Sequence, residues 1–252
     1  MLKHSLLQKT KHYIKKIPGA RQAHFNIRLL CCPTYREDGF VTVHNSDCLS
    51  TDKFKQAYGA GLQRQPGSDL QWRTHVVIWA ATHALNAEGD FVECGVNRAF
   101  FSTAIMDYIN FKAMSDRQFY LFDTYCGLVE EQITEKDTAA SWNEYPDVYE
   151  DVKNAFKDYD NVNVIKGVVP ESLETVNISK VAYLSIDMNC APPEQAALEY
   201  FWPKLSSGGV IVLDDFGWKG HEEQKIMAEN FAAERSVEIL NLPTGQGVII
   251  KP

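Results

Sequence analysis

The sequence lacks the features that mark membrane-spanning, secreted and zinc-finger proteins. No run approaches the ~18 apolar residues of a transmembrane helix, and the N-terminus has no apolar segment typical of a signal peptide. The six cysteines form no C-x-x-C pair, so neither a zinc site nor a disulfide framework is predicted. We therefore expect a cytoplasmic protein whose cysteines are reduced.

Acidic residues are absent before Glu37, although the whole chain carries a net charge of −8. The overall excess of acid argues against a nucleic-acid partner, because nucleic-acid-binding surfaces are normally basic. The N-terminal segment combines basic and apolar residues, namely Lys3, Lys9, Lys11, Lys15, Lys16, Arg21, Arg28, Arg36, Leu6, Leu7, Ile14 and Ile17. This pattern is compatible with peripheral contact to an anionic membrane surface, or with a solvated helix or oligomer arm.

From Asp90 onward, short apolar runs alternate with helical patterns, which predicts β–α units and a parallel sheet. The expected parallel strands are Asp90–Val96, Phe119–Asp123, Val162–Gly167, Val181–Met188 and Gly208–Asp215. A helix over Asp69–Asn86, with Asp69 as its N-cap, is expected to precede them, and another is expected over Glu222–Glu234.

Two further apolar runs, Val237–Leu242 and Gly247–Lys251, are joined by a short link that contains Pro243, Thr244 and Gly245. Because this link is too short for a crossover helix, the two strands must be antiparallel. The predicted fold is α/β, with a doubly wound, mostly parallel seven-stranded sheet and a C-terminal antiparallel hairpin. This is the layout of the class I (Rossmann-like) S-adenosylmethionine (SAM) methyltransferases. We expect residues 69–252 to form this domain and residues 1–68 to form a basic helical or irregular extension.

The ends of the predicted strands carry the candidate cofactor residues, because ligands of open α/β sheets bind beyond the carboxyl ends of the strands. The first strand ends in FVECGV and lacks G-x-G-x-x-G, which argues against a nicotinamide enzyme. Glu93 could instead offset the positive charge of SAM, and Gly95 would let the backbone approach it. Asp123 is either a ribose ligand or a turn residue, and Gly167 lies either beside the adenine or in an ordinary turn.

Three aspartates follow two strands that we expect to be neighbours. Asp187 ends the fourth strand, and Asp214 and Asp215 end the fifth. Because neighbouring strands lie about 4.8 Å apart, the three carboxylates would repel one another unless a cation lay between them. Oxygen donors of this kind suit Mg²⁺ or another hard divalent cation. Alternatively, one aspartate of the pair caps the next segment and Asp187 points to solvent.

The succession FVECGV, YLFDTYCGL, VIKGVVPESL, YLSIDMN, GGVIVLDDFGW and LPTGQGVIIK resembles the macrocin O-methyltransferase (TylF-type) family over about residues 70–251. The resemblance implies Mg²⁺-dependent methylation of sugar hydroxyls in natural products. It places the metal ligands at Asp187, Asp214 and Asp215 and SAM contacts at Glu93, Gly95, Ser102 and Asp123. It also implies a homo-oligomer and a small-molecule or saccharide acceptor.

One position departs from the pattern of the family. Many relatives have an acid two residues after the first metal ligand, proposed in some as the general base, but this chain has Asn189. His221 is an alternative base, because the ordinary pKa of a histidine side chain lies near the working range, or it is a surface or substrate-contacting residue. Asp187 and His221 are therefore the candidate catalytic residues.

The acceptor is less well defined by the sequence. Trp142, Tyr145, Trp218 and His221 could line a sugar site or could serve in core or lid packing, and residues 130–158 are a candidate lid. Two other functions stay open. A metal-independent methyltransferase would need Glu93 and Asp123 but would ignore chelators, and a non-catalytic oligomeric or membrane-surface scaffold would bind neither SAM nor metal.

Overall fold

The computed structural model describes residues 19–133 and 145–252, which fall into two compact units on either side of the Cys48–Leu49 bond. The first unit contains α2 (Ala20–Cys31) and a small antiparallel hairpin of β1 (Tyr35–Glu37) and β2 (Phe40–Thr42). Arg36 donates hydrogen bonds to the carbonyls of Leu29 (2.7 Å) and Leu30 (2.8 Å) at the C-terminal end of α2. No side chain of α2 is buried.

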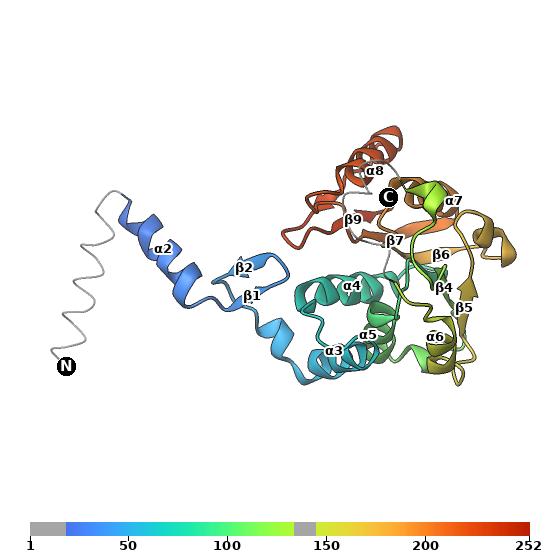
Figure 1. Ribbon diagram of the computed structural model, residues 1–252, viewed down its shortest axis with the longest axis horizontal. Coiled ribbons are helices and arrows are strands. Elements are labelled where there is room, and N and C mark those ends of the chain that lie inside the picture. Colours follow the sequence, from blue (N-terminus) through green and yellow to red (C-terminus); the bar gives the residue numbers. More distant parts are fainter. Residues whose placement is uncertain (1–18, 134–144) are drawn as a thin grey trace. The chain divides into compact units, whose positions relative to one another are not determined.

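The second unit is a seven-stranded sheet with helices on both faces (Figure 1). Its elements in chain order are α3 (Asp52–Arg64), α4 (Gln71–Ala84), β3 (Asp90–Cys94), α5 (Phe100–Ile109), β4 (Phe119–Asp123), α6 (Tyr149–Ala155), β5 (Val162–Lys166), β6 (Val181–Ile186), α7 (Ala191–Phe201), β7 (Leu205–Leu213), α8 (Glu222–Glu234), β8 (Leu240–Asn241) and β9 (Gly247–Ile250). Short 3-10 helices are Asp47–Ser50, which spans the boundary between the two units, and Phe111–Ala113, Glu130–Gln132, Glu171–Thr175 and Trp202–Lys204 in the second unit.

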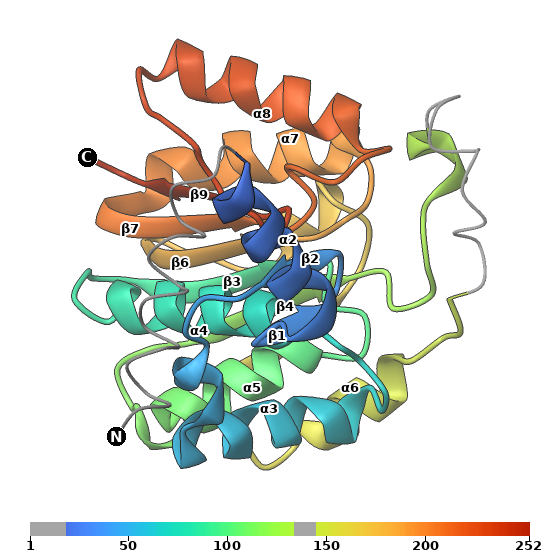
Figure 2. The ribbon, with the colours of Figure 1, turned by 90° about the vertical axis from the view of Figure 1, so that its left-hand side faces the viewer.

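The strand order is β5-β4-β3-β6-β7-β9-β8. The first five strands in this order run parallel, and β9 pairs antiparallel with both β7 and β8. The predicted fold class, a mostly parallel seven-stranded sheet closed by an antiparallel hairpin, is therefore confirmed. In the view of Figure 2, α3 and α5 lie towards the opposite side of the sheet from α7 and α8.

Alternating side chains fill the core on both faces of the sheet. On one face, the buried rings of Phe91 and Tyr183 lie 5.3 Å apart, and Phe91 also contacts Phe111. On the other face, Leu184 belongs to a buried cluster with Ala197 and Phe231, which come from α7 and α8. Since both faces are covered, the parallel strands are almost continuously apolar.

Several predicted boundaries needed correction. Asp69 is not the N-cap of α4, because Leu70 holds that position and its N–H is bound by the Tyr58 hydroxyl oxygen at 3.0 Å. Strand β7 begins earlier than predicted, at Leu205, since Leu205 pairs with Val181 while the polar residues after it hide the pattern. Strand β8 is shorter than predicted because the N–H of Val237 instead donates to the Ala232 carbonyl (3.0 Å) at the end of α8.

Three further features of the fold concern the expected N-terminal extension, the cysteines and membrane-spanning helices. Helix α3 lies within the region expected as an extension, residues 1–68, yet it packs on α5 in the second unit. All six cysteines are free thiols. Across the parts of the chain that the structure describes, no helix is long and apolar enough to cross a membrane.

Candidate active site

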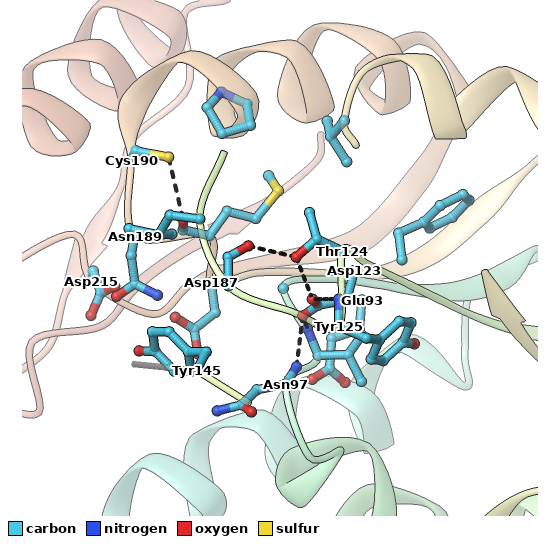
Figure 3. A pocket seen from close by; sticks show the side chains of 18 of the residues that line it. Glu93, Asn97, Asp123, Thr124, Tyr125, Tyr145, Asp187, Asn189, Cys190 and Asp215 are labelled. Carbon is cyan, nitrogen blue, oxygen red and sulfur yellow. Dashed lines mark hydrogen bonds between the residues drawn. The ribbon is translucent and has the colours of Figure 1, made fainter. Parts of the chain in front are cut away.

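A cavity of about 310 Å³ lies beyond the carboxyl ends of the parallel strands. It brings together most of the residues selected from the sequence, including Glu93, Gly95, Asp123, Tyr145, Gly167, Asp187, Asn189, Asp215, Trp218 and His221. In Figure 3, Asp215, Asn189 and Tyr145 lie towards one end of the cavity and Asp123, Thr124 and Tyr125 towards the other. Ser102 and Asp214 do not line the cavity themselves. Ser102 binds Glu93, and Asp214 binds Arg73, and both of these partners line it.

Asp187, Asp214 and Asp215 form one cluster, in which one carboxylate oxygen from each lies within 4.8 Å of the others. The backbone holds them in place: Asp187 N–H donates to the Cys94 carbonyl (2.9 Å) and Asp214 N–H to the Ile186 carbonyl (3.0 Å). Strand β7 ends at Leu213, so the chain turns at the aspartate pair. The two consecutive side chains are consequently not forced to opposite faces of the sheet.

The cluster concentrates negative charge in a poorly solvated place. Burial, followed by the charges of Asp214 and Asp215, raises the pKa of Asp187 well above its usual range. Burial and the Asp214 charge raise the pKa of Asp215 to about 6. The buried Oδ2 of Asp215 has no hydrogen-bond donor among the described residues. An unsatisfied carboxylate oxygen among hard oxygen donors fits a divalent cation.

The loop between β3 and α5 has the positive φ values that are typical of a glycine-rich loop, although only one of these positions is a glycine. Gly95 (φ 88°), Asn97 (φ 48°) and Ala99 (φ 63°) alternate with other residues and all have positive φ. A Cβ at Gly95 would lie 1.8 Å from the Asp187 carbonyl oxygen, so the close passage of β6 requires glycine here. The spacing E-x-G-x-N-x-A could have revealed Asn97 and Ala99, which sequence reasoning missed.

Asp123 fixes this loop through both of its carboxylate oxygens. Its Oδ2 accepts hydrogen bonds from the N–H groups of Val96 (2.6 Å) and Asn97 (2.7 Å). Its Oδ1 accepts one from the N–H of Tyr125 at 2.5 Å, and the Thr124 hydroxyl lies 3.3 Å from the same oxygen. In the structure, Asp123 therefore acts as a turn residue, one of the two roles considered from the sequence, because its carboxylate binds backbone N–H groups. Since each carboxylate oxygen can accept two hydrogen bonds, Oδ2 has no position left, and a ribose hydroxyl would have to take the second position on Oδ1 in place of the Thr124 hydroxyl.

Glu93 is buried (2% exposed) and lines the cavity. Burial raises its pKa to about 8, although the hydrogen bond that Ser102 Oγ donates to Oε2 (2.5 Å) opposes this shift. Ser102 therefore acts on the cavity through Glu93. Gly167 lines the cavity as well, and a Cβ there would lie 2.8 Å from Cβ of Ser172.

His221 is buried and immediately precedes α8. Its Nδ1 lies 2.7 Å from Gln224 Nε2 and 3.9 Å from Asp215 Oδ2. Asn189 also lines the cavity, with a φ of 59°. The structure therefore places His221, the candidate base, and Asn189, which occupies the position of the missing acid, on the wall of one cavity.

Three further polar residues surround the acidic cluster and were not found from the sequence. Arg73 of α4 binds Asp214 Oδ2 (2.5 Å), and Gln246 Nε2 donates to Asp214 Oδ1 (2.8 Å). Buried Glu194 accepts a hydrogen bond from the Met188 N–H (3.2 Å), next to Asp187. Arg73 and Asp214 are 141 positions apart, so no local motif signals their contact.

Comparison with known families assigns the chain. The family model of macrocin-O-methyltransferase (TylF) matches residues 75–240, and the chain belongs to this family. The curated demethyldecarbamoylnovobiocin O-methyltransferase of Streptomyces niveus is 26% identical over 141 residues. That alignment covers 52% of this chain and 54% of the relative, so the chain matches about half of the relative's length.

Solved structures share the fold. The O-methyltransferase NovP superposes with a TM-score of 0.61 at 21% identity, covering 71% of this chain and 79% of NovP. CalS11, a calicheamicin methyltransferase, superposes with a TM-score of 0.59 at 17% identity, covering 82% of this chain and 94% of CalS11. At these identities the likeness establishes the fold alone.

Proposed function

We propose that this protein is a SAM-dependent, divalent-metal-dependent O-methyltransferase acting on a hydroxyl of a sugar, a glycosylated natural product or a polysaccharide. One observation carries the proposal: a single cavity joins the strand-end residues Glu93 and Asp123 to the acidic residues Asp187 and Asp215. A methyl donor and a metal-bound acceptor must meet in this way. Membership of the O-methyltransferase family supports the same reaction.

The cofactor end of the cavity is formed by the β3–α5 loop and the end of β4. In the proposal, Glu93 faces the cationic part of SAM, the backbone at Gly95 allows its close approach, and Asp123 with Gly167 lies beside the ribose and adenine. SAM would supply the methyl group. Ser102 orients the Glu93 carboxylate through the hydrogen bond described above.

The acidic end of the cavity would hold the metal through Asp187, Asp214 and Asp215. A divalent cation held there would lower the pKa of the acceptor hydroxyl and help to orient it. The carboxylates would fix the position of the cation relative to the methyl donor, because the backbone anchors them at the ends of β6 and β7. Positioning supplies a large share of such catalysis.

The proton of the acceptor hydroxyl needs a destination. Asn189 cannot accept it, because an amide has no basic site in this range. We assign this role to His221, which lines the cavity within 3.9 Å of Asp215. Tyr145 and Trp218 line the same end and are the candidate sugar contacts. Trp142 and residues 134–144 of the candidate lid lie outside the described residues.

Calorimetric titration tests the proposed function without knowledge of the acceptor. S-adenosylhomocysteine and Mg²⁺ are titrated separately into EDTA-treated protein, and the titrations are repeated with Asp215→Asn. Asp90→Asn is the matched control, since Asp90 lies at the opposite end of the sheet, at the start of β3. We expect Asp215→Asn to weaken Mg²⁺ binding by at least about tenfold and Asp90→Asn to leave it unchanged.

The alternatives give different results. A metal-independent methyltransferase would bind S-adenosylhomocysteine but show no Mg²⁺ signal that depends on Asp215. A scaffold without catalytic function would bind neither ligand. Either result contradicts the proposed function, and the first leaves the methyl-donor half of it intact.

A further inference from the structure

Arg73 reaches from α4 into the acidic cluster and pairs with one of its members. Its Nη1 lies 2.5 Å from Asp214 Oδ2, and the side chains are only 14% and 2% exposed. Its guanidinium also lies over the Trp218 ring, with Cζ 5.1 Å from the ring centroid. A buried ion pair that is in addition stacked on an aromatic ring holds its geometry well.

Asp214 differs from Asp215 in its hydrogen bonds. Both oxygens of Asp214 have protein donors, Arg73 on Oδ2 and Gln246 on Oδ1. Gln246 is fully buried, and its own Oε1 accepts a hydrogen bond from Thr244 Oγ1 at 3.0 Å. By contrast, Oδ2 of Asp215 has no hydrogen-bond donor in the described parts of the chain. A cation that enters the cluster must share Asp214 with a guanidinium that is already bound there.

We propose that Arg73 is an internal counter-cation that sets the affinity of the cluster for a divalent ion. This inference rests on the proposed metal site. Without a metal, the positive charge of Arg73 offsets part of the repulsion among the three carboxylates. With a metal, the same charge repels the ion and competes for Asp214, so the site binds more weakly than three aspartates alone would. Arg73 is a positioning residue and need not touch a substrate.

The test measures Mn²⁺ affinity by calorimetry and by the electron paramagnetic resonance of free Mn²⁺. The variants are Arg73→Gln, which removes the charge, and Arg73→Lys, which keeps it. Arg64→Gln is the matched control, because Arg64 is 16% exposed and pairs with Asp151 at 2.6 Å on another part of the unit. We expect Arg73→Gln to lower the Kd for Mn²⁺ by at least about tenfold, and Arg73→Lys and Arg64→Gln to stay near wild type.

A second measurement separates the charge effect from simple packing. The melting temperature of each protein is recorded in EDTA and in saturating Mn²⁺. Arg73→Gln should be destabilised in EDTA and should recover more than wild type when Mn²⁺ is added, because the ion replaces the missing charge. A residue that only packs would lower the melting temperature equally in both conditions, which would contradict the proposal.

The remaining outcomes distinguish this inference from the proposed function. If wild type binds Mn²⁺ and Arg73→Gln binds it equally or more weakly, the inference is wrong while the metal site stands. If only Arg73→Gln binds Mn²⁺, the inference is supported in its strongest form. If no variant binds Mn²⁺, the metal site itself is absent, and binding of S-adenosylhomocysteine then reports separately on the methyl-donor site.

Discussion

Glu93 is the residue whose protonation should be most visible in the stability of the protein. Its pKa is raised from 4.5 to about 8, so the folded protein holds a proton on Glu93 that the unfolded chain releases between these values. Its contribution to stability is therefore fully present below about pH 4.5, falls as the pH rises, and is lost above about pH 8. Glu93→Gln removes this dependence and can still accept the hydrogen bond from Ser102.

We predict that the free energy of unfolding of wild type falls relative to Glu93→Gln by about 1 kcal/mol per pH unit between pH 5 and pH 8. Urea unfolding of both proteins across this range measures the difference. Buried acids that do not interact with Glu93 titrate alike in both proteins, so their contributions to the free energy of unfolding cancel in the comparison. If the free energies of unfolding of the two proteins changed with pH in the same way, Glu93 would have an ordinary pKa, which would contradict the effect of burial.

Most of the site residues that could be predicted from the sequence follow a strand. Glu93, Asp123, Asp187 and Asp215 were all found because each lies at or just after the end of an apolar run, and the structure brings all four to one cavity. Arg73 lies within an ordinary helix, and Gln246 lies in a hairpin turn. Contacts between such distant residues depend on the tertiary fold, so the local sequence contains no signal for them.

Among the described elements, the β3–α5 loop is notable for three positive φ values at alternate residues. Ala99 is buried in the left-handed region directly before α5, a conformation that costs an alanine about 1–2 kcal/mol. At three alternate residues the backbone of this loop has a positive φ, which is the region that glycine normally occupies. The close passage of the Asp187 carbonyl and the hydrogen bonds to Asp123 hold the loop in this form.

We predict that Ala99→Gly changes the free energy of unfolding by less than about 1 kcal/mol, because relief of the left-handed conformation offsets the loss of a buried methyl group. Ala104→Gly, a control at an equally buried site inside α5, should destabilise by about 2 kcal/mol. Chemical denaturation of both variants gives the comparison. Equal losses would mean that the backbone at Ala99 is not strained.

Element boundaries were predicted best where the apolar pattern and the hydrogen bonds agree. Strand β4 and helix α8 have the predicted bounds, whereas β7 gains polar residues at its start and β8 loses residues to the end of α8. Hydrogen bonds to a neighbouring strand, for β7, or to the end of the preceding helix, for β8, determine where these strands begin. A single sequence contains little information about such pairing.

At the scale of the whole molecule, the order of apolar runs was sufficient to predict the sheet. Five runs separated by helical segments predict parallel strands, and the short final link predicts the hairpin. The position of α3 in the second unit could not be predicted, because its partner α5 lies on the far side of β3 in the sequence. A homo-oligomer and contact of the basic N-terminal segment with a membrane stay predictions.

The central claim is that one cavity holds the methyl donor at the ends of β3 and β4 and a divalent cation at the ends of β6 and β7. The most direct measurement is a crystal structure of the full chain with Mn²⁺ and S-adenosylhomocysteine. Diffraction data collected near the manganese absorption edge would locate the ion by its anomalous scattering. We predict an anomalous peak between Asp187, Asp214 and Asp215, with S-adenosylhomocysteine beside Glu93 and Asp123. An empty acidic cluster at saturating Mn²⁺, or a ligand bound outside this cavity, would contradict the account.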